Sequence, residues 1–485
     1  MNDERATRSI LITGDLATGK TTLLLQLETV LRKRYRLAGV ANIASPRAHR
    51  SAMPAGGYDF RIIPSGESYS WAARRENGFD FNRQNLAVVL SRLRAVGDVE
   101  VCLLDDIGPL ELAGDGFDSV IRKAAGEHGP LVILVVKKRC LEDVVRCYGL
   151  SSSEVYDLDQ RQDHEKIIAE ICHDLENRDA RNIAAFSVLA GLTEVGVGSV
   201  LHAVRVPFKG HFLALVQVMM MIGFGRRLNG RGLYQIAFIA ALLKSFSPAG
   251  PRLKPMFYIF TQGALFALPT SIFGWHFPAM LGGAMLTSVS TVFLSLGFSL
   301  LKYGRAYFEM LETAFNRIIA AAGWGPYPLG SILLTFLLIK ILLAVGITLA
   351  AYHFDFSFIE RRLARIRKLV AHGGPPVELP RGRKRSWKAS AVGACRDMGR
   401  IGFLVPFGIT VTLICIFSNL HDGQLLVMLL RALLVTWLGF MLIRQINPLS
   451  LVHFFRQRGA RGFALAMNHS LTAWSVYRQE GEKDD

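Results

Sequence analysis

Cysteine is scarce in this sequence, and the cysteines that occur show no metal-binding pattern. The 485 residues include six cysteines, with no CxxC pair and no other spacing typical of a metal site. Four of them, Cys102, Cys140, Cys147 and Cys172, fall in the first part of the chain, which we expect to be cytoplasmic and reducing. The sequence therefore predicts free thiols and argues against a disulfide framework or a zinc site.

Charged residues are also few, and their distribution is uneven. They make up 20% of the chain against 51% hydrophobic residues, and the mean hydropathy is +0.29. The apolar excess lies almost entirely after Ala184, so we expect a soluble domain followed by a membrane domain. Residues 1–8 are polar, and we expect no signal peptide. The net charge of +17 comes largely from loops between apolar segments, which is typical of cytoplasmic loops and argues against a nucleic-acid partner.

Short apolar runs, separated by helical or turn-rich stretches, characterise the first part of the chain. We predict strands over 9–13, 38–43, 100–105 and 131–136, and a helix over 21–34. Continuous apolar runs of this length are typical of parallel strands that are covered on both faces. The sequence therefore predicts an α/β domain, a three-layer sandwich that ends near Arg181.

Residues 14–21 read GDLATGKT and fit the phosphate-loop (P-loop) pattern GxxxxGK[ST], directly after a predicted strand and directly before a predicted helix. Glycines let backbone N–H groups turn toward phosphate oxygens, the lysine reaches the β and γ phosphates, and the hydroxyl ligates Mg²⁺. The helix N-terminus adds the positive end of its dipole. We therefore predict binding of Mg²⁺ and a nucleoside triphosphate, with ATP favoured. The predicted contacts are Gly14, Asp15, Leu16, Ala17, Thr18, Gly19, Lys20, Thr21 and Thr22, with Thr21 as a metal ligand.

A P-loop also needs an acidic residue at the end of a neighbouring strand to hold the Mg²⁺ shell. Two acids, Asp105 and Asp106, end the predicted strand over 100–105. We predict Asp105 as the carboxylate on the metal side and Asp106 as the catalytic group that orients or deprotonates water, beside Lys20 as a second catalytic residue. Glu111 is the nearest alternative base. The guanine-reading NKxD motif and the LSGGQ signature of ABC-type ATPases are both missing, which argues against those two classes.

After Ala184 the apolar segments lengthen to the scale of membrane spans. We predict an all-α membrane domain of eight spans, at 185–203, 209–225, 232–247, 255–274, 277–301, 328–351, 400–419 and 424–443, and an amphipathic helix over 301–322. The chain then divides into an NTPase domain, a six-span bundle, a basic linker, two further spans and a tail. Their predicted bounds are 1–181, 182–352, 353–399, 400–444 and 445–485.

Orientation follows from the rule that Lys and Arg concentrate on the cytoplasmic side. Basic clusters follow the second, sixth and eighth predicted spans, and all three lie inside if the N-terminal domain is inside. We therefore expect a multi-pass protein of the inner (plasma) membrane, with the N-terminal domain and the C-terminus cytoplasmic. Six basic residues conflict with this by flanking outer loops: Lys244, Arg252, Lys254, Lys302, Arg305 and Arg317. Either these residues contact a ligand or lipid, or a span is miscounted.

The P-loop and the sequence DDIGPLEL at 105–112 together resemble a family of small nucleoside-triphosphatases related to nucleotide kinases, over residues 7–160. In that family an arginine-containing segment follows the second strand, and residues 45–47 (SPR) with 57–60 (GYDF) are similar to it. The resemblance implies hydrolysis of the terminal phosphate with broad base tolerance, and it implies that Arg47 stabilises the γ phosphate. The family has Glu where this chain has the shorter Asp106, which predicts slow turnover.

The membrane region resembles the substrate-binding components of energy-coupling factor vitamin transporters, on its six short-looped spans and the sequence PFKGHF at 207–212. Those components bind a small molecule inside a six-helix bundle and are driven by a separate ATPase. The resemblance implies a small-molecule solute and further transporter subunits as partners. Polar residues at membrane depth are candidate ligand contacts. They are Glu194, His202, His211, Gln217 and Gln262.

Two functions remain open at this point. In the first, a membrane-anchored nucleoside-triphosphatase couples Mg-ATP hydrolysis to transport or gating of a small molecule by its bundle. In the second, a nucleotide hydrolase or kinase is held at the lipid bilayer, and the membrane region is an anchor or a sensor. Eight spans exceed what anchoring requires, which favours the first function.

Overall fold

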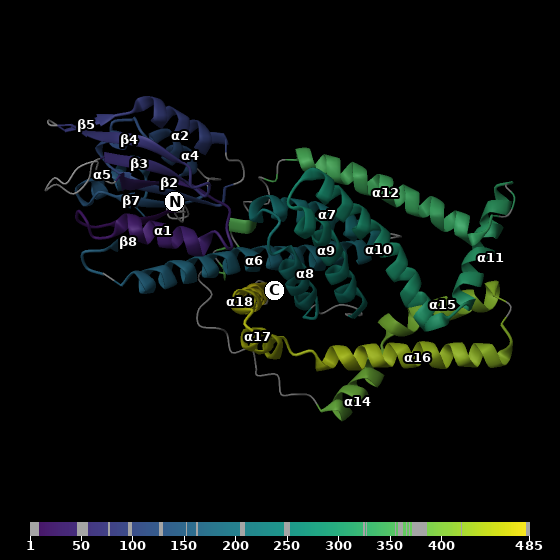
Figure 1. Ribbon diagram of the computed structural model, residues 1–485. Coiled ribbons are helices and arrows are strands. Elements are labelled where there is room, and N and C mark those ends of the chain that lie inside the picture. Colours follow the sequence, from purple (N-terminus) through teal and green to yellow (C-terminus); the bar gives the residue numbers. More distant parts are fainter. Residues whose placement is uncertain are drawn as a thin grey trace. The chain divides into compact units, whose positions relative to one another are not determined.

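The computed structural model of the chain contains two compact units, Met1–Leu175 and Glu176–Asp485 (Figure 1). The structure describes residues 9–45, 57–75, 78–95, 99–125, 130–151, 153–161, 163–203, 209–246, 253–323, 325, 327–354, 356, 362–364, 366–367, 369–370, 386–418 and 420–481.

The first unit is built on one eight-stranded sheet with the strand order β5-β4-β3-β2-β6-β7-β1-β8. Strands β2, β6, β7, β1 and β8 are parallel to one another, whereas β3, β4 and β5 are added antiparallel at one edge. The strands are β1 Ser9–Thr13, β2 Leu37–Ser45, β3 Gly57–Ile63, β4 Ser68–Arg75, β5 Gly78–Phe81, β6 Val101–Ile107, β7 Leu131–Val136 and β8 Glu154–Asp157.

Helices cover both faces of this sheet, because alternate residues of the apolar strands point to opposite faces. Ile10 and Ile12 pack with α1 and the start of α6, while Leu11 packs with α2, α4 and α5 on the other face. The predicted three-layer α/β domain is confirmed. The helices of this unit are α1 Lys20–Leu31, α2 Arg83–Ala95, α3 Pro109–Leu112, α4 Asp118–Ala124, a 3-10 turn Lys138–Cys140, α5 Leu141–Tyr148 and the start of α6 His164–Ala203.

Two features of the sheet differ from the sequence-based expectation. The acidic strand β6 is not a neighbour of β1, because β7 lies between them. The antiparallel strands β3 to β5 and the edge strand β8 were not predicted, because their residues alternate or mix polar and apolar side chains. The parallel strands nevertheless bring their carboxyl ends to the same edge, where β1, β6 and β7 end at Thr13, Ile107 and Val136.

The second unit is entirely helical in its described residues. Besides the rest of α6 it contains α7 Lys209–Leu228, α8 Leu233–Lys244, α9 Leu253–Phe273, α10 Phe277–Tyr303, α11 Ala306–Ala321, α12 Leu329–His353, α14 Trp387–Met398, α15 Ile401–Phe417, α16 Asp422–Gln445, α17 Pro448–Gln457 and α18 Arg461–Gly481. The helix expected over 301–322 is present as α11.

The structure does not confirm eight membrane spans. Within the described residues, four helices are long and apolar enough to cross a membrane, namely α9, α10, α12 and α16. The pair α14 and α15, bent by 63°, makes a fifth if it counts as one span. The expected spans at 185–203, 209–225 and 232–247 are helical. However, α8 has only 12 residues, and α6 and α7 are not among the helices that are long and apolar enough to cross a membrane. Arg226 and Arg227 lie in the last turn of α7, so its apolar stretch is shorter than the helix.

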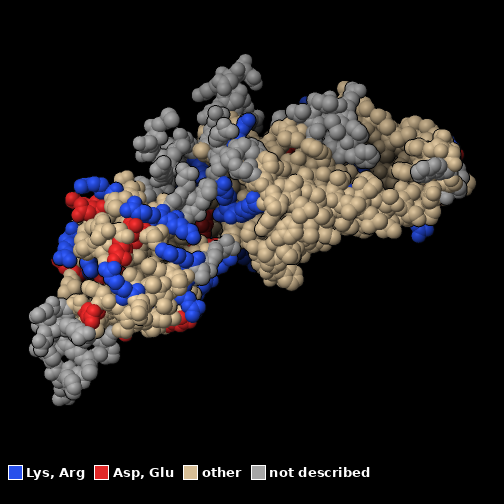
Figure 2. Space-filling view, turned by 90° about the horizontal axis from the view of Figure 1, so that it is seen from above, with Lys and Arg blue, Asp and Glu red and all other residues tan. Residues whose placement is uncertain are grey.

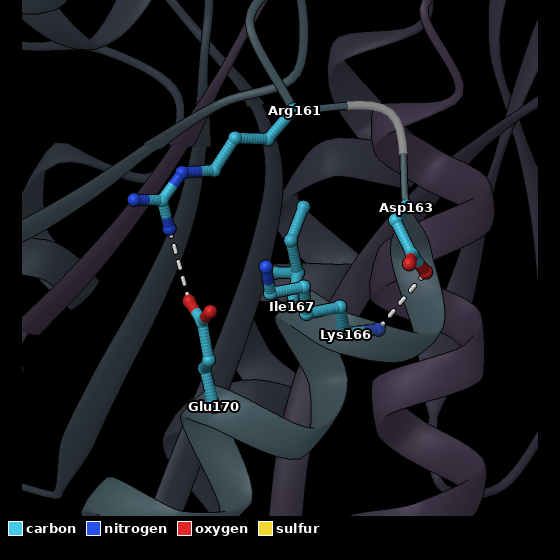
Figure 3. Close-up of a pocket in the computed structure, with 5 residues that line it drawn as sticks. All are labelled: Arg161, Asp163, Lys166, Ile167 and Glu170. Carbon is cyan, nitrogen blue, oxygen red and sulfur yellow. Dashed lines mark hydrogen bonds and ion pairs between the residues drawn. The ribbon is translucent and has the colours of Figure 1, made fainter.

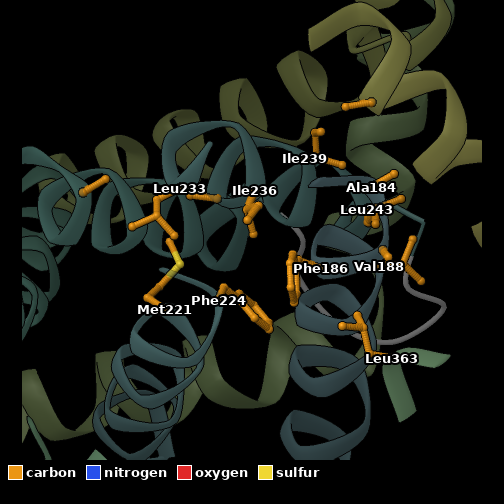
Figure 4. Packing of buried hydrophobic residues seen from close by; sticks show 14 of the residues in the cluster. Ala184, Phe186, Val188, Met221, Phe224, Leu233, Ile236, Ile239, Leu243 and Leu363 are labelled. Atoms are coloured by element: carbon orange, nitrogen blue, oxygen red, sulfur yellow. The ribbon is translucent and has the colours of Figure 1, made fainter. Parts of the chain in front are cut away.

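A large apolar cluster forms the main core of the second unit. Phe186, Phe224 and Phe266 are almost fully buried in it. Figure 4 shows Phe186, Phe224 and Ile236 pointing into the same interior. In Figure 2, basic and acidic side chains mark the surface of the first unit, whereas the visible face of the helical unit is almost entirely uncharged.

Candidate active site

Residues 14–19 form a tight loop between β1 and the first turn of α1. Gly19 has φ 86°, a left-handed conformation that glycine adopts without strain. At Gly14 (φ 151°) there is no room for a side chain, since a Cβ atom would lie 2.8 Å from Thr18 Oγ1. These glycines let the backbone wrap closely enough for its N–H groups to face one ligand, as the P-loop pattern predicts.

The side chain of Lys20 folds back over this loop. Its Nζ donates a hydrogen bond to the carbonyl oxygen of Gly14 at 2.8 Å and another to that of Asp15. The hydroxyl of Thr18 also donates to the Asp15 carbonyl, at 3.0 Å. The ammonium group is therefore held at the mouth of the loop, where phosphate oxygens can replace the two carbonyls as its partners.

Asp105 and Thr21 come together beside the loop. Thr21 Oγ1 donates to Asp105 Oδ2 at 2.8 Å, and the backbone N–H of Asn42 donates to the same oxygen at 3.0 Å. Asp105 is only 3% exposed, and burial raises its pKa to about 6, although the two hydrogen bonds act in the opposite direction. Although β7 separates the two strands, α1 carries Thr21 across to the end of β6.

These two side chains fit a divalent cation. Carboxylate and hydroxyl oxygens are the ligand types that Mg²⁺ takes beside a bound triphosphate. A buried carboxylate that now has only neutral hydrogen-bond donors around it would gain an opposite charge from such an ion. The predicted pair of metal ligands is thus consistent with this geometry.

Asp106 is more accessible than Asp105, and its side chain is 41% exposed. Its Oδ1 lies 3.2 Å from Lys137 Nζ, and its Oδ2 accepts a hydrogen bond of 3.1 Å from Asn42 Nδ2. The residue has φ 62°, in the left-handed region. Sequence reasoning did not identify Lys137 or Asn42. The position of Lys137, directly after the apolar strand β7, was the available signal, because that strand ends at the same edge of the sheet.

Comparison with known proteins supports this assignment. The sequence model of the NTPase family matches residues 9–172. Residues 9–172 are an NTPase-family domain. The chain is similar to a nucleoside-triphosphatase THEP1 from Methanopyrus kandleri, with 29% identity over 144 residues, 28% of this chain and 77% of that protein. It is also similar to the nucleoside-triphosphatase THEP1 of Sulfolobus acidocaldarius, with 26% identity over 144 residues, 28% of this chain and 81% of that protein.

One solved structure is also similar to part of this chain. The crystal structure of THEP1 from the hyperthermophile Aquifex aeolicus has 20% sequence identity and a TM-score of 0.26, and the alignment covers 34% of this chain and 96% of that one. The sequence match at 9–172 confirms the family that was expected from residues 7–160.

Glu111, the alternative base, has a structural role in the NTPase-family domain. Its Oε2 accepts a hydrogen bond of 2.9 Å from the N–H of Gly108, and its Oε1 accepts one of 3.4 Å from the N–H of Phe117. The side chain is buried, and burial raises its pKa. Because both carboxylate oxygens hold the loop that follows β6, Glu111 is not placed to act on a water at the phosphate site.

A second pair of charged residues, Asp159 and Lys138, lies beside the P-loop. Asp159, which follows β8, accepts hydrogen bonds from the backbone N–H of Asp15 at 3.0 and 3.1 Å. Lys138 pairs with Asp159 and, at 3.4 Å, with Asp157. The pKa of Asp159 is lowered, mainly by its hydrogen bond with Lys138. Sequence reasoning missed this pair, because nothing in the motif places the end of β8 beside the loop.

A surface hollow of the NTPase-family domain, about 290 Å³, lies away from the P-loop. It is lined by the segment after β8 and the start of α6, and its residues Arg161 and Glu170 pair with each other at 2.9 Å (Figure 3). No residue of the P-loop lines it. Arg47, predicted to stabilise the γ phosphate, lies outside the described residues.

Proposed function

We propose that this chain is a membrane-anchored nucleoside-triphosphatase that binds a nucleoside triphosphate with Mg²⁺, ATP being favoured, and hydrolyses its terminal phosphate. The observation that carries the proposal is the meeting of Thr21 and Asp105, 2.8 Å apart, beside a P-loop with Lys20 at its mouth. Family membership supports the reaction class, since two similar proteins are named nucleoside-triphosphatases.

Each group then has a separate task. Backbone N–H groups of residues 14–22 bind phosphate oxygens, and the ammonium of Lys20 offsets the charge on the β and γ phosphates. Mg²⁺, held by Thr21 and Asp105, would neutralise charge that develops on the phosphate oxygens. Asp106 orients the attacking water and accepts its proton, while Lys137 and Asn42 fix the position of the carboxylate. Arg47 remains a proposed stabiliser of the γ phosphate.

The second unit is proposed to lie in the inner (plasma) membrane and to bind a small solute whose transport or gating is coupled to hydrolysis. Large apolar side chains support contact with lipid, since Leu342 on α12 is 70% exposed and Val427 on α16 is 65% exposed. A bundle that served only as an anchor would not need the buried polar groups that its helices carry, such as Gln217 and Gln262, whereas a sensor, the other form of the alternative function, would. Further transporter subunits remain proposed partners.

The nucleotide site is tested by Thr21→Ala in the full-length protein, reconstituted in liposomes. We expect the Mg²⁺ concentration needed for half-maximal phosphate release to rise about tenfold, because the metal loses one of its protein ligands. Thr29→Ala is the matched control, since Thr29 lies on the same helix and donates only to the backbone oxygen of Leu25. An unchanged Mg²⁺ requirement in Thr21→Ala would exclude the proposed metal site.

The membrane arrangement is tested by cysteine labelling at Ser386, in the predicted cytoplasmic linker, in a variant without native cysteines. We expect an impermeant maleimide to label Ser386→Cys only after cells are opened, because the Lys and Arg residues of this linker are typical of a cytoplasmic loop. Labelling in intact cells would place this segment outside and would contradict the proposed topology.

A further inference from the structure

Lys340 is a buried cation in the middle of the apolar helix α12. It is 3% exposed, and its Nζ lies 2.7 Å from Nδ1 of His211 on α7 and 2.7 Å from Oγ1 of Thr291 on α10. Thr291 donates its own hydroxyl hydrogen to the carbonyl oxygen of Ser288 at 2.7 Å, so it accepts from the ammonium. Three helices thus converge on one ammonium group and offer it only neutral acceptors.

Carboxylates are missing from the surroundings of Lys340. Helices α7, α9, α10 and α12 contain no Asp or Glu, and neither does any position from Val195 to Phe308. Glu312 on α11 accepts from the N–H of Leu329 at the start of α12, eleven residues from Lys340 and therefore about 16 Å away along the helix. Across the described part of the chain, no ion pair joins Lys340 to an acid. A buried charge without an opposite charge is costly in an apolar medium.

Further positive charge gathers at the same place. Lys254, on the first turn of α9, is close enough for its charge to act on His211 and on Lys302. Its Nζ lies 5.5 Å from the ring centroid of Tyr258 and 6.0 Å from that of Phe298. His211 lies in the first turn of α7, where the positive end of the helix dipole adds to these charges. Lys254 and Lys302 are two of the basic residues that conflict with the expected orientation.

We infer that Lys340, His211 and Thr291 form a binding site for a small organic carboxylate. One carboxylate carries the single negative charge that matches one buried ammonium, and the threonine hydroxyl and the imidazole beside it are hydrogen-bonding groups of suitable type. Helix N-termini that point at an anionic group near the middle of a helical bundle are a known way to bind substrate carboxylates. The inference rests on the proposed solute-binding role of the second unit, but it does not require nucleotide hydrolysis.

The test uses the full-length protein in phosphatidylcholine nanodiscs without nucleotide, so that the lipid headgroups carry no net charge. Benzoate, benzamide and benzamidinium share a ring and nearly the same shape, and carry a negative, no and a positive charge. We expect benzoate alone to raise the melting temperature in a saturable way. Lys340→Met should weaken benzoate binding about tenfold or more, which is the effect of losing one charge-assisted hydrogen bond.

Lys388→Met is the control, because Lys388 belongs to the same unit and its side chain is exposed on α14. It should leave benzoate binding unchanged. If Lys340→Met does not fold, Thr291→Val keeps the side-chain shape and should still weaken binding severalfold. Three results would each overturn the inference. They are equal stabilisation by benzamide, binding of inorganic phosphate but not of benzoate, and full benzoate affinity in a folded Lys340→Met protein. None of these results would bear on phosphate release by the first unit.

Discussion

Asp105 in the first unit and Lys340 in the second are equally inaccessible, at 3% exposure each, but their surroundings differ. Asp105 stands at the end of a strand beside a P-loop, and a hydroxyl and a backbone N–H donate to it. Lys340 stands within an apolar helix and donates to a neutral ring nitrogen and a hydroxyl. In both places the protein supplies neutral partners and leaves the opposite charge to come from elsewhere.

The comparison shows how far a buried charge identifies its ligand. Around Asp105 the sequence pattern indicates which ligand supplies the opposite charge, because a P-loop implies a triphosphate and its cation. Around Lys340 no pattern exists, and only the sign and size of the charge point to a ligand class. The chemistry of the first unit is therefore specific, whereas that of the second is defined to the level of a carboxylate.

The largest expected effect separates the two acids of the first unit. Asp106→Asn should lower the rate of phosphate release about a hundredfold, because the amide cannot accept a proton from water. Mg-ATP affinity should stay within about twofold, since Asp105 and the loop are intact. Stopped-flow binding and phosphate-release assays measure the two quantities. Asp143→Asn on the exposed face of α5 is the control, and an Asp106→Asn enzyme of normal rate would move the base elsewhere.

The next effect tests how the loop uses its lysine. Lys20→Ala should lower Mg-ATP affinity or turnover at least about tenfold, because the β and γ phosphates lose the ammonium that offsets their charge. Lys33→Ala, beyond the end of the same helix, should change neither. Isothermal titration measures the affinity and a Michaelis curve measures the turnover. An unchanged curve for Lys20→Ala would exclude residues 14–22 as the phosphate site.

A pH series distinguishes the buried acid from an ordinary one. Because burial raises the pKa of Asp105 to about 6, the carboxylate takes up a proton as the pH falls through this value. Mg-ATP affinity should then fall about tenfold for each pH unit below 6. For the ligand-free protein the sign is reversed. The folded state binds the extra proton, so this group adds stability at low pH and loses it as the pH rises toward 6. Asp105→Asn should abolish both dependences.

The smallest expected effect asks whether the two buried charges influence each other. Lys340→Met should change the dissociation constant of Mg-ATP less than about twofold when no carboxylate is present. If solute and nucleotide binding are coupled, benzoate will shift Mg-ATP affinity in the wild-type protein, and nucleotide will shift benzoate affinity by the same factor. A large change in Lys340→Met without any carboxylate would show that the lysine serves the fold rather than a ligand.

Sequence patterns predicted the first unit well where a motif and a strand coincide. Strands β1 and β7 have the predicted bounds, and the loop, Thr21 and Asp105 meet as the P-loop pattern implies. The antiparallel strands β3 to β5 escaped prediction, because their residues mix polar and apolar side chains and form no continuous apolar run. Lys137 and Asp159 escaped for another reason, since each reaches the site from the end of a strand that no motif marks.

The second unit was predicted less completely, because apolar composition gives helices but not spans. Each of the eight expected segments contains a helix, yet α8 is short, and α6 and α7 are not among the helices long and apolar enough to cross a membrane. His211 was named as a candidate from its depth alone. Lys340 was missed, although a lone lysine in the run 329–353 was visible in the sequence, because nothing there showed which helix would face it.

The left-handed backbone of Asp106 restricts which amino acids can occupy that position. Glycine, asparagine and aspartate adopt this conformation at little cost, whereas most other residues pay about 1–2 kcal/mol and β-branched ones more. In a saturation library of position 106, folded protein should therefore survive best with these three residues, and only aspartate among them should retain full hydrolysis. Substitutions at this one position would therefore distinguish what folding requires from what hydrolysis requires.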